Sequence, residues 1–348
     1  MAERPIQHHT VPAGYLRGFA SPATPMLVVQ TRDGKRYRKR PEELAVRRHY
    51  HSVRNPDGTI DPTPEIVLAE KIENDGLSLL RDVANRKPLS HVGRAKLSIY
   101  MAIQYLRTPL RRDDYESVFS AMLNTVSKKL VHSPLLERFL MEHQERPEED
   151  AKKLAEEVRD AVLNEKLVIE TKPEASLAAI FTHCREIAEV FSQMKWDVWV
   201  ANGNDFITSD CPVYFGRIGN PDSVALLDPA TVIHFPLTRS AFLLMRHGEP
   251  DESKRRKLIR LFGEQYSEGF VLYPYLIDYV AANAEAVESF NAQTARSCHE
   301  QIFCPNDSHD YSELLREAPD NVTSHFEDVG EGYLMVRNVR GATPGLKK

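Results

Sequence analysis

The feature of this sequence that most constrains its fold is a short segment, residues 97–106, that is apolar on nearly every side. A helix without a polar face must be buried, because water cannot solvate any side of it. The segment ends at Arg107-Thr108-Pro109, since the residue before a proline is disfavoured in the α conformation. The sequence therefore predicts a central buried helix around which the other elements pack.

Further helices are predicted on both sides of this one, giving a helical layer over residues 64–194. Pro64 and Glu65 suit the first turn of a helix, where proline is tolerated and an acid meets the positive end of the helix dipole. Segments 147–165 and 175–194 have apolar residues at helical spacing. Glu65, Glu70 and Glu73 are interpreted as a solvated face of the first helix.

Short strands are predicted towards both ends of the chain, where apolar runs are bounded by turn residues. They cover residues 26–30, a segment around Tyr37 after the turn 32–35, and residues 49–53, 196–200, 206–208 after the turn 202–204, 232–235, 241–245 and 333–336. Helices are expected near 251–266 and 281–299. Strands, then helices, then strands are typical of an α+β fold, so we expect strands from both ends to share a sheet packed on the helical layer. The predicted organisation is one domain over 1–305 and a polar C-terminal extension over 306–348, with two domains as the alternative.

The charge balance limits the partners that the whole chain attracts. It carries 45 Lys and Arg against 50 Asp and Glu, a net charge of −5. An acidic protein has no general attraction to nucleic acid, so any such binding needs a local basic patch. The four cysteines are sparse, no apolar run resembles a signal peptide, and none is long enough to span a bilayer. We therefore expect a cytoplasmic protein with no membrane partner; the sequence indicates no oligomeric state.

Several enzyme classes are excluded by missing motifs. The sequence contains no Gly-rich phosphate loop, no Gly-x-Ser-x-Gly elbow and no kinase motif set, which argues against Rossmann and P-loop enzymes. It also lacks Cys-x-x-Cys and His-Glu-x-x-His, and the Cys and His residues between 298 and 304 do not fit zinc spacing. His8, His9 and Asp210 are acceptable metal-ligand types. No cofactor is identified, and a divalent metal remains one alternative.

The N-terminal segment His8-His9-Thr10-Val11-Pro12 is the most distinctive chemical feature. Proline fixes the backbone just beyond the two imidazoles, and Tyr15 and Phe19 can anchor the turn in a core. A histidine held in this way can act as an acid, a base, a metal ligand or a phosphate partner. The alternative is a surface histidine that hydrogen-bonds the backbone.

Polar residues on the central helix form a second candidate. Tyr100, Gln104 and Arg107 are spaced at i, i+4 and i+7, which places them on one face. A buried guanidinium needs a carboxylate or an anionic ligand. Arg107 is therefore either a structural partner of Asp210 or Glu73, or a clamp for a phosphate or carboxylate.

A third candidate, Ser209-Asp210, directly follows a predicted strand. An acid at a strand end is well placed for a functional site, because such sites collect on loops held by a rigid scaffold. Ser and Asp ahead of Pro212 also form a good turn. The turn is the favoured interpretation unless another element converges on it.

Four ordered motifs together resemble a known bacterial family, domain of unknown function 4238, over residues 6–305. They are His9-x-Val11-Pro12-x-x-Tyr15-Leu16-x-x-Phe19, Gln104-x-x-Arg107-Thr108-Pro109, Phe206-Ile207-Thr208-Ser209-Asp210-x-Pro212-Val213 and Phe235-Pro236-Leu237-Thr238. In that family the first motif reads Gln-His or His-His, so His9 is the closer match and His8 occupies a variable position. Cys211 stands where the family often has Asn, a departure that concerns packing.

The resemblance implies that His9, Arg107 and Ser209-Asp210 belong to one site. The resulting hypothesis is a hydrolase, such as a nuclease or phosphodiesterase in phage defence, that acts on an anionic small molecule or nucleic acid. His9, Asp210 and Arg107 would be its catalytic residues. His8, Tyr15, Gln104 and Ser209 would bind the substrate. The alternative is a sensor or interaction protein in which the same residues form a buried structural network.

Overall fold

The structure is a computed structural model that describes residues 6–21, 23–55, 57–131, 134–143, 147–164, 166–167, 172–217, 226, 230–248, 277–317, 322–328 and 334–340. The chain divides into two compact units. Unit 1 comprises residues 1–109 and 177–318, and unit 2 comprises residues 110–176 and 319–348. These bounds differ from those of the predicted domain over 1–305, and whether that domain folds as one body stays a prediction.

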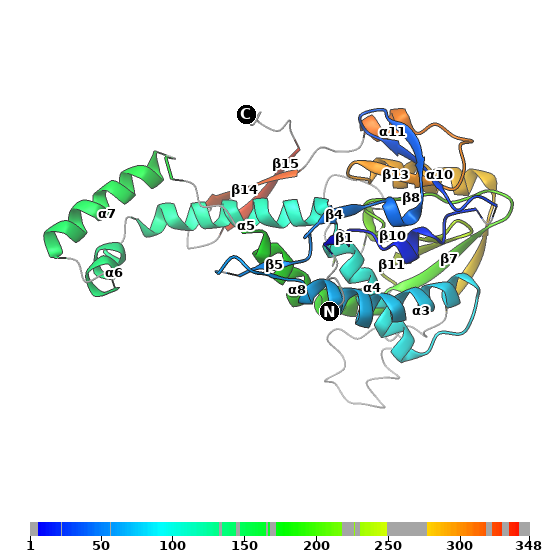
Figure 1. The fold of residues 1–348 in the computed structure, drawn as a ribbon, viewed down its shortest axis with the longest axis horizontal. Helices are drawn as coiled ribbons and strands as arrows, with labels where there is room; N and C mark the ends of the chain where they lie inside the picture. The colour runs from blue at the N-terminus through cyan, green and yellow to red at the C-terminus, as the bar shows by residue number, and fades with distance from the viewer. Residues whose placement is uncertain are drawn as a thin grey trace. The chain divides into compact units, whose positions relative to one another are not determined.

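Unit 1 contains the elements that carry the predicted site residues (Figure 1). In chain order they are β1 (Gln7–His9), α1 (Ala13–Leu16), β2 (Leu27–Thr31), β3 (Arg36–Lys39), the 3-10 turn η1 (Pro41–Glu43), β4 (Val46–Arg48), β5 (Val53–Arg54), β6 (Ile60–Asp61), α2 (Thr63–Val67), the π-helical turn η2 (Leu68–Glu73), α3 (Asn74–Ala84), α4 (His91–Leu106), most of α8 (Pro173–Gln193), β7 (Lys195–Ala201), β8 (Thr208–Ser209), β9 (Tyr214–Arg217), β10 (Thr231–Thr238), β11 (Ala241–Arg246), β12 (Ile277–Ala282), α10 (Ala284–Arg296), β13 (Gln301–Cys304) and α11 (Ser312–Glu317).

Unit 2 contains α5 from Leu110 onward, α6, α7 and the β14–β15 hairpin. Their bounds are α5 (Pro109–Leu130), α6 (Leu135–His143), α7 (Glu148–Leu163), β14 (Val322–Asp328) and β15 (Leu334–Arg340). α6 and α7 bury a small apolar cluster that includes Leu140, Ala151 and Ala155. Among the helices that the structure describes, none is both long and apolar enough to cross a membrane.

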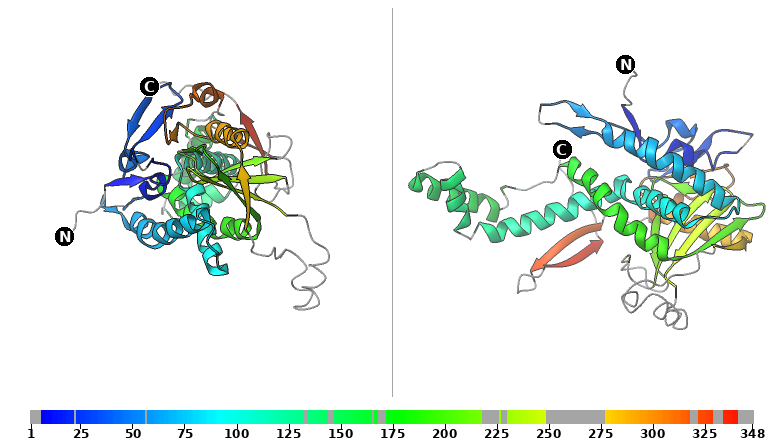
Figure 2. Two further views of the ribbon diagram at one scale, coloured as in Figure 1. Left: turned by 90° about the vertical axis from the view of Figure 1, so that its right-hand side faces the viewer. Right: turned by 90° about the horizontal axis from the view of Figure 1, so that it is seen from below.

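A five-stranded sheet, in the order β12-β7-β11-β10-β9, forms the centre of unit 1. Only the β12–β7 pair is parallel. One face packs on α3, α4 and α8 through side chains such as Trp196, Phe235, Met101 and Phe191. The other face packs on α10 through Phe242 and other apolar residues. The sheet therefore lies between α10 on one side and α3, α4 and α8 on the other, as the left view in Figure 2 shows.

A second sheet, in the order β3-β2-β13-β8, joins distant parts of the chain. β13 pairs antiparallel with β2 from the N-terminal stretch and with β8. The predictions of an α+β fold and of a sheet shared between both ends of the chain are confirmed.

Two predicted strands are wrong, and one element lies outside the described residues. Residues 49–52 form a turn between β4 and β5, in which His49 has the left-handed value φ 51°. The strand predicted over 206–208 is reduced to β8, which pairs with β13 rather than returning to β7. Phe206 and Ile207 do not extend β8, because their backbone N–H groups donate to the Arg239 carbonyl oxygen and the Asn291 side chain instead of to a neighbouring strand. The helix predicted near 251–266 falls outside the residues that the structure describes.

α4 contains the predicted central segment and ends at Leu106, with Arg107 as its C-cap, as expected from Thr108-Pro109. The approach of α3 to α4 depends on Gly76. A Cβ at this position would lie 2.3 Å from Cγ of Tyr100, a buried residue of α4. Gly76 therefore lets the Tyr100 ring pack directly on the α3 backbone.

We predict that Gly76→Ala destabilises the protein by about 1–3 kcal/mol, because the methyl group overpacks the Tyr100 ring. Gly93→Ala is the matched control in a neighbouring helix. Its added Cβ would lie 2.9 Å from Leu89 Cδ1, the end of a flexible side chain. Urea unfolding measures both variants, and equal losses of stability would contradict this account.

Candidate functional site

The buried side of β1 carries His8, which meets a second histidine and a carboxylate. His8 and His51 are both fully buried, and their rings stack at 6.0 Å between centroids. The backbone N–H of His51 donates to His8 Nδ1 at 2.9 Å. Glu65 Oε2 lies 3.9 Å from His8 Nδ1 and 4.0 Å from His51 Nε2. Two imidazoles thus flank one carboxyl oxygen at distances just beyond a hydrogen bond.

Glu65 is the unusual group in this cluster. Only 9% of the residue is exposed, and Oε2 has no hydrogen-bond partner among the described residues. Burial raises the pKa of Glu65 to about 7, with a smaller contribution from the charge of Glu73 and an opposing one from Arg107. A buried carboxyl with a pKa near neutrality can both release and accept a proton at physiological pH.

Arg107 connects three elements at the end of α4. Its Nε donates to the carbonyl oxygen of Thr10 at 3.0 Å, and Nη1 pairs with Glu73 Oε1 at 2.6 Å. The Arg107 side chain is fully buried, while 17% of the Glu73 side chain is exposed. Of the two acidic partners considered for Arg107, the structure shows Glu73. Arg107 therefore fastens the N-terminal arm and the π-helical turn to the central helix.

Several buried polar atoms beside this pair have no hydrogen bond within the described part of the chain. The buried atoms without a hydrogen-bond partner among the described residues include Arg107 Nη2, Tyr100 Oη and both amide atoms of Gln104. Tyr100 lies within electrostatic range of Glu73 and Arg107. Buried polar groups are almost always hydrogen-bonded, so this concentration distinguishes the inner face of α4 from an ordinary helix interface.

His9 lies on the opposite face of β1 from His8, because successive strand residues point to opposite sides. Its Nε2 is 3.2 Å from the carbonyl oxygen of Glu42, and the residue is half-buried. Burial lowers the pKa of His9, while the Glu42 carbonyl and the Glu73 charge oppose this effect. Burial therefore favours the neutral form of the His9 imidazole.

Asp210 is not paired with His9 in the part of the chain that the structure describes. Its carboxylate accepts hydrogen bonds from the backbone N–H groups of His299, Glu300 and Gln301, at 2.9, 2.7 and 3.2 Å. Burial raises the pKa of Asp210, against the effect of these donors. Asp210 thus holds the turn between α10 and β13.

Tyr15 and Ser209 also have structural partners. The Tyr15 hydroxyl donates to the carbonyl oxygen of Pro236 at 2.7 Å and lies 2.8 Å from Thr208 Oγ1. Ser209 Oγ accepts from the backbone N–H of Cys211 at 3.1 Å, as the turn interpretation predicts. Their predicted roles in binding a substrate stay predictions.

The structure brings His8, His9, Gln104 and Arg107 into one region. It adds His51 and Glu65, which the sequence did not indicate as site residues. It also places Glu73 there, one of the two partners that the sequence offered for Arg107. The prediction of a solvated face for Glu65 and Glu73 is wrong for these two. Glu65 precedes the fully buried Leu68 by three residues, so the two side chains share one face of the helix. This spacing from an apolar residue was the sequence signal that Glu65 is buried. No group of three or more His, Cys, Asp or Glu among the described residues is placed to hold a metal ion.

A separate cavity of about 120 Å³ lies elsewhere in unit 1. It is lined by the β7–β8 loop, α10 and the loop after β13, with Asp205, Glu288 and His309 among its polar residues. It contains none of the predicted site residues.

A family model described as a protein of unknown function, DUF4238, matches residues 7–308. The chain belongs to the DUF4238 family. The predicted membership is thereby confirmed, and the match covers all the elements that build the site. No curated protein matches the chain. No solved structure matches it.

The Arg107–Glu73 pair gives a stability prediction. Glu73→Gln should cost about 3–5 kcal/mol, because it leaves the buried guanidinium without a counter-charge. Lys96→Ala is the control. Lys96 lies on α4, the helix that Arg107 caps, and it pairs with Asp75 through side chains that are 53% and 54% exposed. That exposed pair should be worth less than about 1 kcal/mol. Similar losses in chemical denaturation would contradict the buried role of Arg107.

The raised pKa of Glu65 predicts a pH-dependent stability. Below pH 4.5 the group is protonated in both the folded and the unfolded state. Between its usual value of 4.5 and about 7, the unfolded state loses the proton first, so folding becomes less favourable as pH rises. Glu65→Gln removes this effect and should gain up to about 3 kcal/mol relative to wild type between pH 4 and pH 8. A stability difference between Glu65→Gln and wild type that does not change with pH would contradict the raised pKa of Glu65.

Proposed function

We propose that this chain is a hydrolase that acts on phosphate-bearing substrates and that Glu65 is its acid–base group. The observation that carries the proposal is the position of Glu65 Oε2. This atom is buried, has no hydrogen bond to any residue that the structure describes, and is flanked by His8 and His51. Perturbed carboxyl groups of this kind cluster at functional sites. A π-helical turn, which is frequent at functional sites, directly follows α2, the helix that carries Glu65.

The proposed reaction needs two proton transfers. The ionised Glu65 carboxylate takes a proton from water while the water oxygen attacks phosphorus. The protonated carboxyl then returns the proton to the leaving oxygen as the ester bond breaks. Arg107 is a positioning residue in this scheme, because it is fully buried and already holds Glu73 and Thr10. We place this activity in the cytoplasm, which is supported by the unpaired state of the four cysteines.

We predict that Glu65→Gln lowers hydrolysis of a chromogenic phosphodiester, RNA or DNA by about 10²- to 10⁴-fold, because the amide cannot exchange a proton. The assay is run with and without divalent metal ions. His9→Ala tests the second candidate group, and Lys96→Ala is the control, since its exposed ion pair lies outside the cluster. Equal activity of Glu65→Gln and wild type would remove Glu65 from the reaction.

A second candidate function, a non-enzymatic sensor or interaction protein, is favoured by the burial of Arg107. In that case the whole cluster is a structural network that locks the arm to the helices. The network role predicts that Glu65→Gln and His9→Ala both lower the melting temperature. An active site predicts near-native stability or a gain in these variants, because catalytic groups are often not optimised for stability.

A further inference from the structure

A local basic surface lies next to His9 on a chain that is acidic as a whole. Residues 35–48 contain seven Lys and Arg side chains against two Glu, so this segment carries +5 while the chain carries −5. The segment comprises β3, η1 and β4, and β4 pairs with β1 in the register Gln7↔Arg48 and His9↔Val46. Directly opposed residues share a face of the ladder, so Arg48 lies on the same face as His9.

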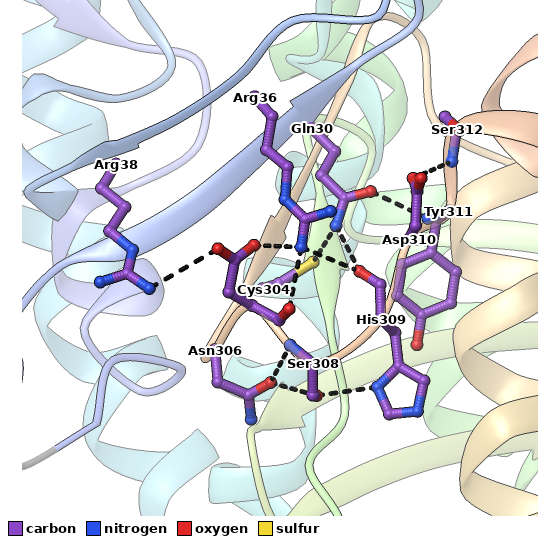
Figure 3. Close-up of polar contacts among 11 residues, drawn as sticks. Gln30, Arg36, Arg38, Cys304, Asn306, Ser308, His309, Asp310, Tyr311 and Ser312 are labelled. Atoms are coloured by element: carbon purple, nitrogen blue, oxygen red, sulfur yellow. Dashed lines mark hydrogen bonds and ion pairs between the residues drawn. The ribbon is translucent and has the colours of Figure 1, made fainter.

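Some of these cations are already neutralised. Arg36 pairs with Asp307, and it also donates to the carbonyl oxygens of Asp307 and His309 in the loop after β13 (Figure 3). Arg38 is 3.7 Å from the same carboxylate. These two arginines hold the loop against β3.

Three others are exposed and free of ion pairs with any described residue, namely Lys39, Arg40 and Arg48. We call them the basic rim. The two acids between them, Glu42 and Glu43, form no ion pair with these three side chains among the described residues. The Glu42 carboxylate accepts from Arg17 at 2.7 Å, and a Glu43 oxygen accepts from the backbone N–H of Arg40. The Glu42 carbonyl, which contacts His9, places η1 beside this histidine.

We infer that the basic rim binds the phosphate backbone of a polynucleotide along the face of β1 and β4 that carries His9. This inference rests on the proposed function for the reaction, and it narrows the substrate from phosphate esters in general to nucleic acid. Three cations that form no ion pair with the described residues, at the end of β3, before η1 and on β4, suit a polyanion. Each phosphate that is neutralised releases counterions. A single mononucleotide would need only one or two of them.

The test measures binding by fluorescence anisotropy in the Glu65→Gln background, so that hydrolysis does not interfere. The probes are labelled RNA and single-stranded and double-stranded DNA of about 20 nucleotides, at about 50–200 mM salt. The variant combines Lys39→Ala, Arg40→Ala and Arg48→Ala. Its control combines Lys87→Ala, Arg185→Ala and Arg296→Ala, three exposed cations in ion pairs elsewhere in unit 1, and changes the net charge equally.

The rim variant should bind at least one of the nucleic acids about tenfold or more weakly, with the slope of log K against log salt reduced in magnitude by about 2–3. The control should retain most of the affinity. Equal losses in both variants, or no polynucleotide binding by the parent protein, would overturn the inference. So would preferential binding of phosphatidylserine vesicles. Hydrolysis of a small phosphodiester that depends on Glu65, without polynucleotide binding, would refute the rim and leave the proposed function standing. Polynucleotide binding that depends on the rim, without hydrolysis, would support the rim and refute the proposed function.

Discussion

The ion pair between Arg107 and Glu73 is the interaction on which the arrangement of this region depends. It joins the end of the central helix α4 to the π-helical turn, and the second donor of Arg107 holds the N-terminal arm through Thr10. A guanidinium can make these contacts together because its donors project in fixed directions. With the arm held in this way, His8 faces the protein interior and His9 faces the surface. The same pair also lies within electrostatic range of Glu65.

The motifs that carry the family resemblance meet in space as structural joints. The Tyr15 hydroxyl contacts both Thr208 and the carbonyl of Pro236, so it connects the first, third and fourth motifs. Arg107 of the second motif binds Thr10, which lies within the first. Asp210 fixes a turn through three backbone amides. The motifs therefore describe how unit 1 is held together, while the acid–base cluster is completed by residues outside them.

Local signals account for the parts of the fold that the sequence predicted. The apolar helix and its stop at Pro109, and the strands that form β10 and β11, are encoded within a few neighbouring residues. The role of Glu65 is different, because its environment is set by His8 and His51, far from it in sequence. The sequence around a helical glutamate looks the same whether its side chain is solvated or buried, and only the tertiary packing decides which of the two occurs. The basic rim could be anticipated in part, since its cations all belong to the basic segment 35–48. That these side chains form no ion pair with the described residues depends on the fold.

Burial beside His8 and His51 raises the pKa of Glu65 to about 7, so this carboxyl holds a proton near neutral pH. The most direct measurement is the infrared difference spectrum of wild type minus Glu65→Gln across a pH titration. We expect a protonated carboxyl band that belongs to Glu65 and disappears with a midpoint near pH 7. A Glu65 band that has already vanished at the usual glutamate value, near 4.5, would contradict it.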